Sequence, residues 1–340
     1  MTSSPRRLPG LALLASAAVF ATTACTSGAG APAAESDGGW SPVTIEHALG
    51  STEITAEPKR VVTIGWSDEA TLLELGVVPV GMPDSTFAGD DEGYLPWDLE
   101  KVEELGGEKP KLFNTDDGIP TEDIAALEPD LILAVQSGIE ENEYEQLSAV
   151  APTIAYLDQP WMTPWQDATV TIGKALGRED DAQQIVEETE GHLADIAAEH
   201  PEFEGTTAAV GGMMPDGNDF AFYLEGDVRP QLLGELGFEN APFVGELKAE
   251  EGAFSAPLSR EKAETIDADV LVLWHNSAEE REKLEKSKVF QEIDAVQNGR
   301  YVGYDDKVQS MAISTPNPLT IPWVAGGLAD DLAEAVDGKA

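Results

Sequence analysis

The sequence predicts an α/β protein of two Rossmann-like lobes, joined by a single long α-helix, with a cleft between the lobes that suits a ligand. The main reason is an internal repeat: residues 120–133 align without gaps on residues 259–272. Each copy combines a short capped helix, an aspartate (Asp130 or Asp269) and an apolar, β-branched run typical of a buried parallel strand. The second reason is that strand and helix patterns alternate on both sides of one long helical stretch.

The start of the chain predicts export. Arg6 and Arg7 precede an apolar run over residues 8–24, which is too short and too rich in small residues for an ordinary membrane span. Cys25 follows, so residues 1–24 resemble a lipoprotein signal peptide, with cleavage before Cys25 and a lipid on its sulfur. Thr22 departs from the aliphatic residue usual there, and a plain secretory signal is the alternative. The Arg pair leaves the export route open between the general and twin-arginine pathways.

Residues 25–42 predict a flexible tether, because they are rich in Gly, Ala, Ser and Pro. An N-terminal α/β lobe is expected over residues 43–164, starting with two strand-like runs around a Gly-Ser turn. Apolar periodicity and capping residues then predict alternating strands and helices. In order these are strand 60–65, helix 67–75, strand 77–82, the short helix of the first repeat copy, strand 131–135, helix 140–150 and strand 153–157.

Residues 165–201 predict the connecting helix, which would span on the order of 50 Å. Pro201 ends it, and a C-terminal α/β lobe follows over residues 202–340. Its expected elements are strands 206–213 and 219–224, helix 228–236, the second copy of the repeat, helix 278–295, strand 300–304 and helix 319–336.

The charge balance limits the possible partners. The 340 residues include 64 Asp and Glu against 20 Lys and Arg, a net charge of −44. Such a surface repels nucleic acid and anionic lipid headgroups. The charge is interpreted either as a solubility or salt adaptation or as attraction of a cationic ligand, which screening limits beyond about 10 Å.

Catalytic motifs are missing from the sequence. There is no Gly-x-Ser-x-Gly elbow, P-loop or Gly-x-Gly-x-x-Gly, and Cys25 is the only cysteine. The four histidines have no close ligand spacing, which argues against a zinc site. We therefore expect a protein that is not an enzyme and has no metal site of its own.

Several phrases resemble one family, the iron-siderophore substrate-binding lipoproteins of ABC importers. The resemblance covers nearly all of residues 42–335 and is carried by the order and spacing of the phrases. They are residues 42–50, 58–65, 124–134, 147–155, 160–165 and 227–238. The resemblance implies the class III fold of substrate-binding proteins, with a rigid connecting helix and little hinge closure. It also implies a monomer, anchored by lipid on the outer face of the cytoplasmic membrane, that passes a ferric siderophore to the permease. No resident cofactor is implied, because iron enters inside the siderophore.

Glu122 and Glu261 occupy equivalent positions of the two repeat copies. The family implies that one acidic residue on each lobe docks to arginines of the permease, and these two match that pattern. The alternative is that both are ordinary first-turn carboxylates, stabilised by the helix dipole.

Ligand contacts are expected at the carboxyl ends of strands, where open α/β sheets bind their ligands. A ferric siderophore needs aromatic surface and a few hydrogen-bond donors. These rules select Trp66, Trp161, Trp165, Tyr223, Arg229, Trp274, His275 and Met311. The alternatives are core packing for the tryptophans, and pairing with Asp227 for Arg229.

The scarcity of cations near these positions predicts the type of ligand. A triscatecholate complex is strongly anionic and would require several Arg or Lys. Arg229 is the one convincing candidate for a cation in the cleft, so a neutral or cationic hydroxamate complex fits better than a triscatecholate. The alternative is a protein of the same fold that binds haem, cobalamin or another iron complex, with His275 as the one histidine placed to ligate it.

Overall fold

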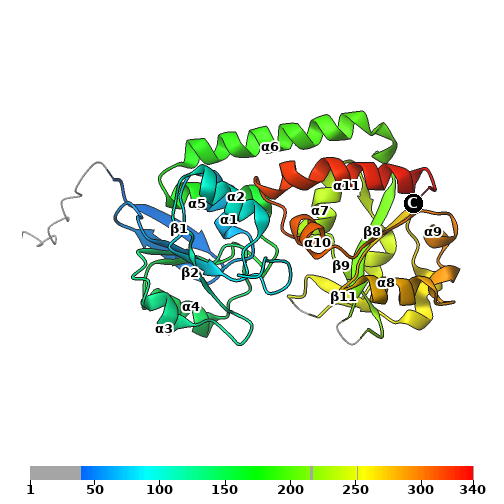
Figure 1. Cartoon of the computed structure of the whole chain (residues 1–340), viewed down its shortest axis with the longest axis horizontal. Helices are drawn as coiled ribbons and strands as arrows, with labels where there is room; N and C mark the ends of the chain where they lie inside the picture. Colours follow the sequence, from blue (N-terminus) through cyan, green and yellow to red (C-terminus); the bar gives the residue numbers. More distant parts are fainter. Residues whose placement is uncertain (1–39, 215–216, 251, 340) are drawn as a thin grey trace, which may run out of the picture. The chain divides into compact units, whose positions relative to one another are not determined.

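The structure is a computed structural model that describes residues 40–214, 217–250 and 252–339 (Figure 1). The predicted signal peptide, Cys25 and the predicted tether before residue 40 lie outside the described residues. Within the described ranges, no helix combines the length and the apolar character needed to cross a membrane.

The described chain begins with an antiparallel hairpin of β1 (Val43–His47) and β2 (Gly50–Ile54). Ile45 and Ile54 face the core, since alternate residues of each strand are buried. The turn lies at residues 48–49, one step before the Gly-Ser pair that the sequence favoured, and Gly50 already belongs to β2.

The N-terminal lobe is built on a five-stranded parallel sheet in the order β5-β4-β3-β6-β7. Every residue of the central strands β3 and β6 is buried, as their apolar composition requires in a sheet covered on both faces. The strands are β3 (Val61–Thr63), β4 (Gly81–Pro83), β5 (Lys111–Phe113), β6 (Leu131–Leu133) and β7 (Thr153–Ile154). The helices are α1 (Asp68–Glu74), α2 (Pro96–Glu104), α3 (Thr121–Ala125) and α4 (Glu141–Ser148).

The C-terminal lobe contains a six-stranded mixed sheet, in which β11-β9-β8-β12-β13 form the path and β10 also pairs with β8. β9 and β11 are antiparallel to their neighbours and the remaining pairs are parallel. The strands are β8 (Thr207–Met213), β9 (Phe220–Tyr223), β10 (Glu239–Asn240), β11 (Ser255–Leu258), β12 (Val270–Trp274) and β13 (Tyr301–Tyr304). The helices are α7 (Val228–Glu235), α8 (Ala278–Glu285), α9 (Asp294–Gln297), α10 (Lys307–Ser314) and α11 (Thr320–Val336), with short 3-10 segments η1 (Pro201–Phe203), η2 (Pro242–Glu246), η3 (Arg260–Thr265) and η4 (Phe290–Glu292).

The two copies of the sequence repeat occupy equivalent places in the two sheets. The first copy forms α3 and β6, and β6 pairs in parallel with β3. The second forms η3 and β12, and β12 pairs in parallel with β8. Asp130 accepts hydrogen bonds from the backbone N–H groups of Lys59 and Arg60 at 2.8–3.0 Å, just before β3. Asp269 likewise accepts from the backbone N–H of Thr207, at 2.9 Å, where β8 begins.

Replacing Asp269 by alanine should lower the free energy of unfolding by about 1 kcal/mol, because the N–H and hydroxyl of Thr207 lose their acceptor. The Thr207 N–H also holds the pKa of Asp269 below its usual value. The stabilisation is therefore present above about pH 4 and is lost as the pH falls through this lowered pKa. Urea titrations at pH 7 and pH 3 measure it, with the exposed Asp267→Ala as control. Equal losses in both variants at pH 7 would contradict the prediction.

The structure corrects the extent of the connecting helix. Residues 165–201 were expected to form one helix, but the chain folds there as α5 (Trp165–Ala175) and α6 (Glu179–Glu199). Gly177 breaks the run with a φ of +67°, the left-handed conformation that ends many helices. Gly173 allows α6 to pack closely on α5, because a Cβ there would lie 2.3 Å from a side-chain carbon of α6. The connection is thus α6 alone, 21 residues and about 30 Å long.

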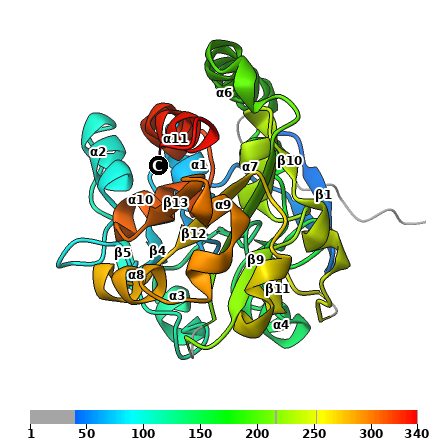
Figure 2. The same ribbon diagram turned by 90° about the vertical axis from the view of Figure 1, so that its right-hand side faces the viewer.

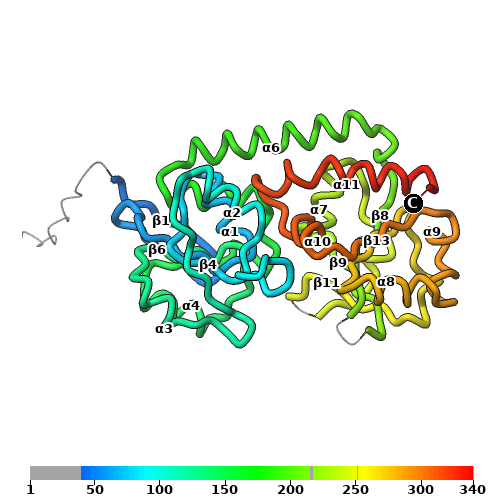
Figure 3. Tube along the Cα trace, viewed as in Figure 1, coloured from blue at the N-terminus to red at the C-terminus, as the bar shows by residue number. Residues whose placement is uncertain are grey.

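α6 runs along both lobes and packs on α5, α7 and α11 (Figures 1 and 2). The chain can be followed through it once, from the N-terminal lobe to the C-terminal lobe (Figure 3). Each lobe has its own buried clusters against its sheet. A further cluster joins the lobes, since Ala88, Leu95 and Trp97 of the N-terminal lobe pack with Ile313, Ile321 and other residues of α10 and α11.

Candidate ligand-binding cleft

Two adjoining cavities lie between the lobes, at the carboxyl ends of β3, β6, β8 and β12. Their volumes are about 430 Å³ and about 200 Å³. Both are lined by Trp66, Arg229 and Ser314, so we treat them as parts of one cleft. The position is the one at which open α/β sheets bind ligands.

The N-terminal wall of the cleft is a pair of tryptophans. Trp66 follows β3, is 52% exposed, and its ring centroid lies 5.3 Å from that of Trp161. Trp161 has a φ of +65°, an unfavourable conformation for a bulky residue. Its backbone N–H donates to the carbonyl of Ser137 at 2.9 Å. Gly138 makes room for the indole, because a Cβ there would lie 2.1 Å from Nε1 of Trp161. Backbone strain of this kind is often found at functional sites.

Asp68 holds the strand ends behind this wall. Its carboxylate accepts from the backbone N–H groups of Val135 at 2.8 Å and Gln136 at 3.1 Å. The carbonyl of Gln136 in turn accepts from the N–H of Trp66 at 3.0 Å. Burial raises the pKa of Asp68 to about 6, although the backbone hydrogen bonds oppose that shift. The side chain of Asp68 therefore holds the end of β6 in place, and the carbonyl of Gln136 there holds the backbone of Trp66.

The C-terminal wall combines a cation with aromatic rings. The guanidinium carbon of Arg229 lies 4.0 Å from the ring centre of Tyr223 and 6.0 Å from that of Phe254. Tyr223 meets Trp274 edge to face at 6.0 Å. Nη1 of Arg229 also donates to Oδ2 of Asp227 at 2.8 Å, while its Nε has no partner among the described residues. The cleft thus combines several aromatic side chains with one guanidinium among the residues that line it.

Comparison with known proteins identifies the family. A model described as "Periplasmic binding protein" matches residues 61–308, well over half of the chain. The chain belongs to this family. Its relatives include the "Probable siderophore-binding lipoprotein YfiY" of Bacillus subtilis, 27% identical over 79% of this chain and 82% of the relative. The "Fe(3+)-citrate-binding protein YfmC" of B. subtilis is 26% identical over 77% and 78%.

A solved structure agrees with the family assignment. PiaA of Streptococcus pneumoniae TIGR4, in complex with ferrichrome, is 32% identical with a TM-score of 0.80, covering 87% of this chain and 99% of that one. The resemblance noted in the sequence and the predicted fold, two α/β lobes joined by one long helix, are both confirmed.

The structure of this periplasmic binding protein places most of the predicted contact residues in the cleft. Those that line it are Trp66, Trp161, Tyr223, Arg229, Trp274, His275 and Met311. Trp165 is the exception and is removed from the candidate contacts. It is 3% exposed, packs in the core, and its indole N–H donates to the carboxylate of Glu235 at 3.1 Å.

His275 lies at the cleft as a hydrogen-bonding residue. It is 2% exposed, and its Nε2 is 2.7 Å from the hydroxyl of Tyr301. Burial lowers its pKa, so the ring is neutral near pH 7. No group of three or more His, Cys, Asp or Glu suited to a metal ion occurs in the part of the chain that the structure describes.

Some lining residues were not selected from the sequence. Phe87 and Asp84 follow β4, so the strand-end rule could have found them. Phe254 precedes the antiparallel strand β11, to which that rule does not apply. Glu122 and Glu261 are exposed at the starts of α3 and η3, outside the cleft.

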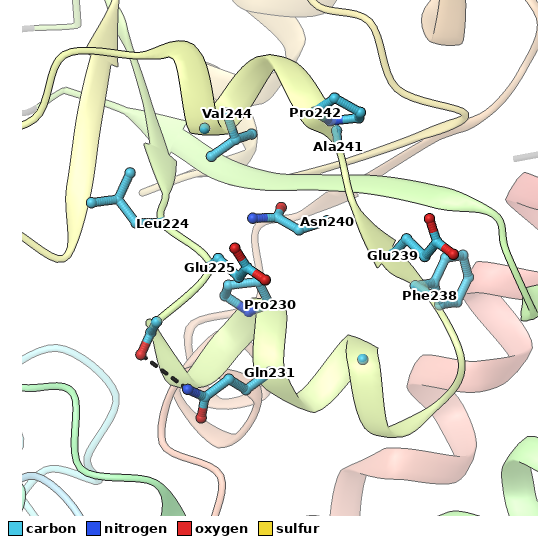
Figure 4. A pocket seen from close by; sticks show the side chains of 13 residues that line it. Leu224, Glu225, Pro230, Gln231, Phe238, Glu239, Asn240, Ala241, Pro242 and Val244 are labelled. Carbon is cyan, nitrogen blue, oxygen red and sulfur yellow. Dashed lines mark hydrogen bonds between the residues drawn. The ribbon is translucent and has the colours of Figure 1, made fainter.

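A separate cavity of about 1090 Å³ lies within the C-terminal lobe (Figure 4). It is lined by α7, the segment of β10 and η2, and the loop that carries Glu225. The side-chain amide of Gln231 donates there to the carbonyl of Gly226 at 3.1 Å. It shares no lining residue with the cleft and contains no tryptophan, so the cleft remains the better candidate site.

Proposed function

We propose that this chain is the extracytoplasmic substrate-binding lipoprotein of an ABC importer, and that it captures a ferric siderophore of the hydroxamate type. The observation that carries the proposal is the aromatic cleft with a single, already paired cation, in a chain similar to ferrichrome-bound PiaA. The relatives are named as binding proteins, which supports a role without catalysis. The names of the relatives also support extracytoplasmic location, and we propose Cys25 as the lipid anchor.

The chemistry of the cleft suits such a ligand. A ferric hydroxamate has an organic shell that can pack on Trp66 and Trp161, and oxygen atoms that accept hydrogen bonds from Arg229. The chelator satisfies the iron, so the protein needs no metal ligands of its own. An anionic complex would meet Asp84 and Asp116 on the same walls, with little positive charge to offset them.

The test is a tryptophan-fluorescence titration of residues 40–340 with ferrichrome, ferrioxamine B, ferric citrate, a ferric triscatecholate, haem and cobalamin. We expect saturable quenching by a ferric hydroxamate, because Trp66 and Trp161 lie where it would bind. Metal-free chelators and corrections for absorbance serve as controls. A response to haem or cobalamin alone would replace the siderophore with that ligand. Selective quenching by the catecholate would overturn the hydroxamate assignment, and no response at all would contradict the proposal.

The importer is proposed to recognise Glu122 and Glu261, one on each lobe. Replacing both by alanine should abolish most siderophore uptake by cells while the affinity for the ligand stays unchanged, since both side chains are exposed and outside the cleft. The matched control is the double variant Asp123→Ala, Glu264→Ala, which removes the same charge from exposed positions on the same two segments. Loss of ligand affinity, or equal loss of uptake in the control, would contradict a docking role.

A further inference from the structure

We infer that Asp227 sets the charge selectivity of the cleft: by pairing with Arg229 it cancels the positive charge that would otherwise attract anionic ferric complexes. This inference rests on the proposed function and deepens it, since it names the residue that excludes one class of substrate. Arg229 is the only lysine or arginine among the described residues that line the cleft. The group that offsets its charge therefore decides the sign of the charge that a ligand meets.

The ion pair is held rigidly. Nη1 of Arg229 lies 2.8 Å from Oδ2 of Asp227, and the two residues are 7% and 1% exposed. Asp227 is also the N-cap of α7, where its Oδ1 accepts from the backbone N–H of Arg229 at 2.9 Å. The guanidinium also lies over the ring of Tyr223. Neither partner can turn away without losing these contacts, so the cancellation is built into the fold.

The remaining charges near the cleft do not restore a positive field. Asp84 and Asp116 line the larger cavity and are acidic. Lys307 reaches the ring of Phe87 at 5.0 Å but is not among the lining residues. With Arg229 paired, an anionic ligand would be desolvated against a neutral or negative wall, whereas a neutral or cationic one would not be penalised.

The decisive variant is Asp227→Asn. Asparagine has nearly the same shape and remains a good N-cap, so α7 keeps its start while Arg229 becomes an uncompensated cation. The matched control is Glu225→Gln, which removes the same charge two residues earlier. Glu225 is exposed and lines the separate cavity of Figure 4. Asp227→Ser, which also retains a capping side chain, guards against a folding defect in the first variant.

The experiment compares the affinities of the full-length protein in detergent for ferric citrate (anionic), ferrichrome (neutral) and ferrioxamine B (cationic). Asp227→Asn should bind ferric citrate at least tenfold more tightly and ferrioxamine B at least tenfold more weakly than the wild type, with ferrichrome changed less than threefold. The gain for citrate should shrink as NaCl is raised. Asp227→Ser should follow the same order, and Glu225→Gln should resemble the wild type.

Three outcomes would overturn the inference. Equal gains for citrate in Asp227→Asn and Glu225→Gln would assign selectivity to the acidic surface as a whole. Parallel changes for all three complexes would make Asp227 a structural residue only. Unchanged affinities in both Asp227 variants would show that the pair does not select charge. Failure of the proposed function is separate, because it requires that the wild type itself binds neither hydroxamate complex.

Discussion

Replacing Trp97 by alanine should lower the free energy of unfolding by about 3–5 kcal/mol, the range found when a buried tryptophan is truncated. Trp97 lies on α2 and is 3% exposed. It belongs to the cluster that includes Ile321 and Val324 of α11, and its ring centroid lies 5.5 Å from that of Trp323. α2 belongs to the N-terminal lobe and α11 to the C-terminal lobe (Figure 1). Because Trp97 packs against α11, its side chain helps to hold the lobes together.

Its partner provides a matched control. Trp323 is 48% exposed, so Trp323→Ala removes the same side chain but leaves a much smaller cavity, and should cost less than about 1 kcal/mol. Urea denaturation followed by circular dichroism measures both variants independently of tryptophan emission. If the two variants lose similar amounts of unfolding free energy, burial of the side chain does not decide its contribution to stability, and the lobes are not joined mainly through Trp97.

The strand pattern was predictable from the sequence because it is local. Apolar β-branched runs marked β6 and β12, and the aspartate before each run marked the strand beginning. Strand ends then led to Trp66 and Trp274, because parallel strands present the residues at their carboxyl ends at one edge of the sheet. Tyr223 ends the antiparallel strand β9, so its place in the cleft does not follow from that rule.

What the sequence missed depends on contacts between distant parts of the chain. Trp165 is of a residue type common in binding sites, and only its packing in the core and its hydrogen bond to Glu235 of α7 show that it is buried away from the cleft. The break between α5 and α6 follows from Gly177, a residue that helices tolerate in other places. The sequence offered two alternatives for Arg229, a ligand contact or a partner for Asp227. The structure shows that Arg229 pairs with Asp227 and also lines the cleft.

The second prediction concerns two buried carboxyl groups and their effect on the pH dependence of stability. Glu69, in the first turn of α1, is 6% exposed, and Asp98, in the first turn of α2, is 1% exposed. Neither oxygen of Asp98 has a hydrogen-bond partner among the described residues, and one oxygen of Glu69 also lacks one. The nearby cation Lys101 is engaged by Glu74 at 3.0 Å. Burial raises the pKa of Asp98 to about 8, and burial followed by the charge of Asp98 raises the pKa of Glu69 well above its usual value.

These raised pKa values make stability fall as the pH rises. In the unfolded chain both groups release their protons near pH 4, whereas the folded chain retains them to much higher pH. Between about pH 4 and pH 8 the folded state therefore binds more protons than the unfolded state, and the free energy of unfolding decreases with pH. At alkaline pH the wild type must hold ionised carboxylates in a buried site without a cation.

Asp98→Asn should remove much of this dependence, because asparagine has a similar shape and cannot ionise. We expect the variant to match the wild type within about 1 kcal/mol at pH 5 and to exceed it by about 4 kcal/mol at pH 8.5, since each pH unit between the two pKa values costs the wild type about 1.4 kcal/mol. Urea titrations across this range measure the difference. Glu100→Gln, an exposed charge removal on the same helix, should leave the slope unchanged. If both variants keep the wild-type slope, Asp98 is ionised and solvated in the folded protein, and the acid pair contributes nothing to its pH dependence.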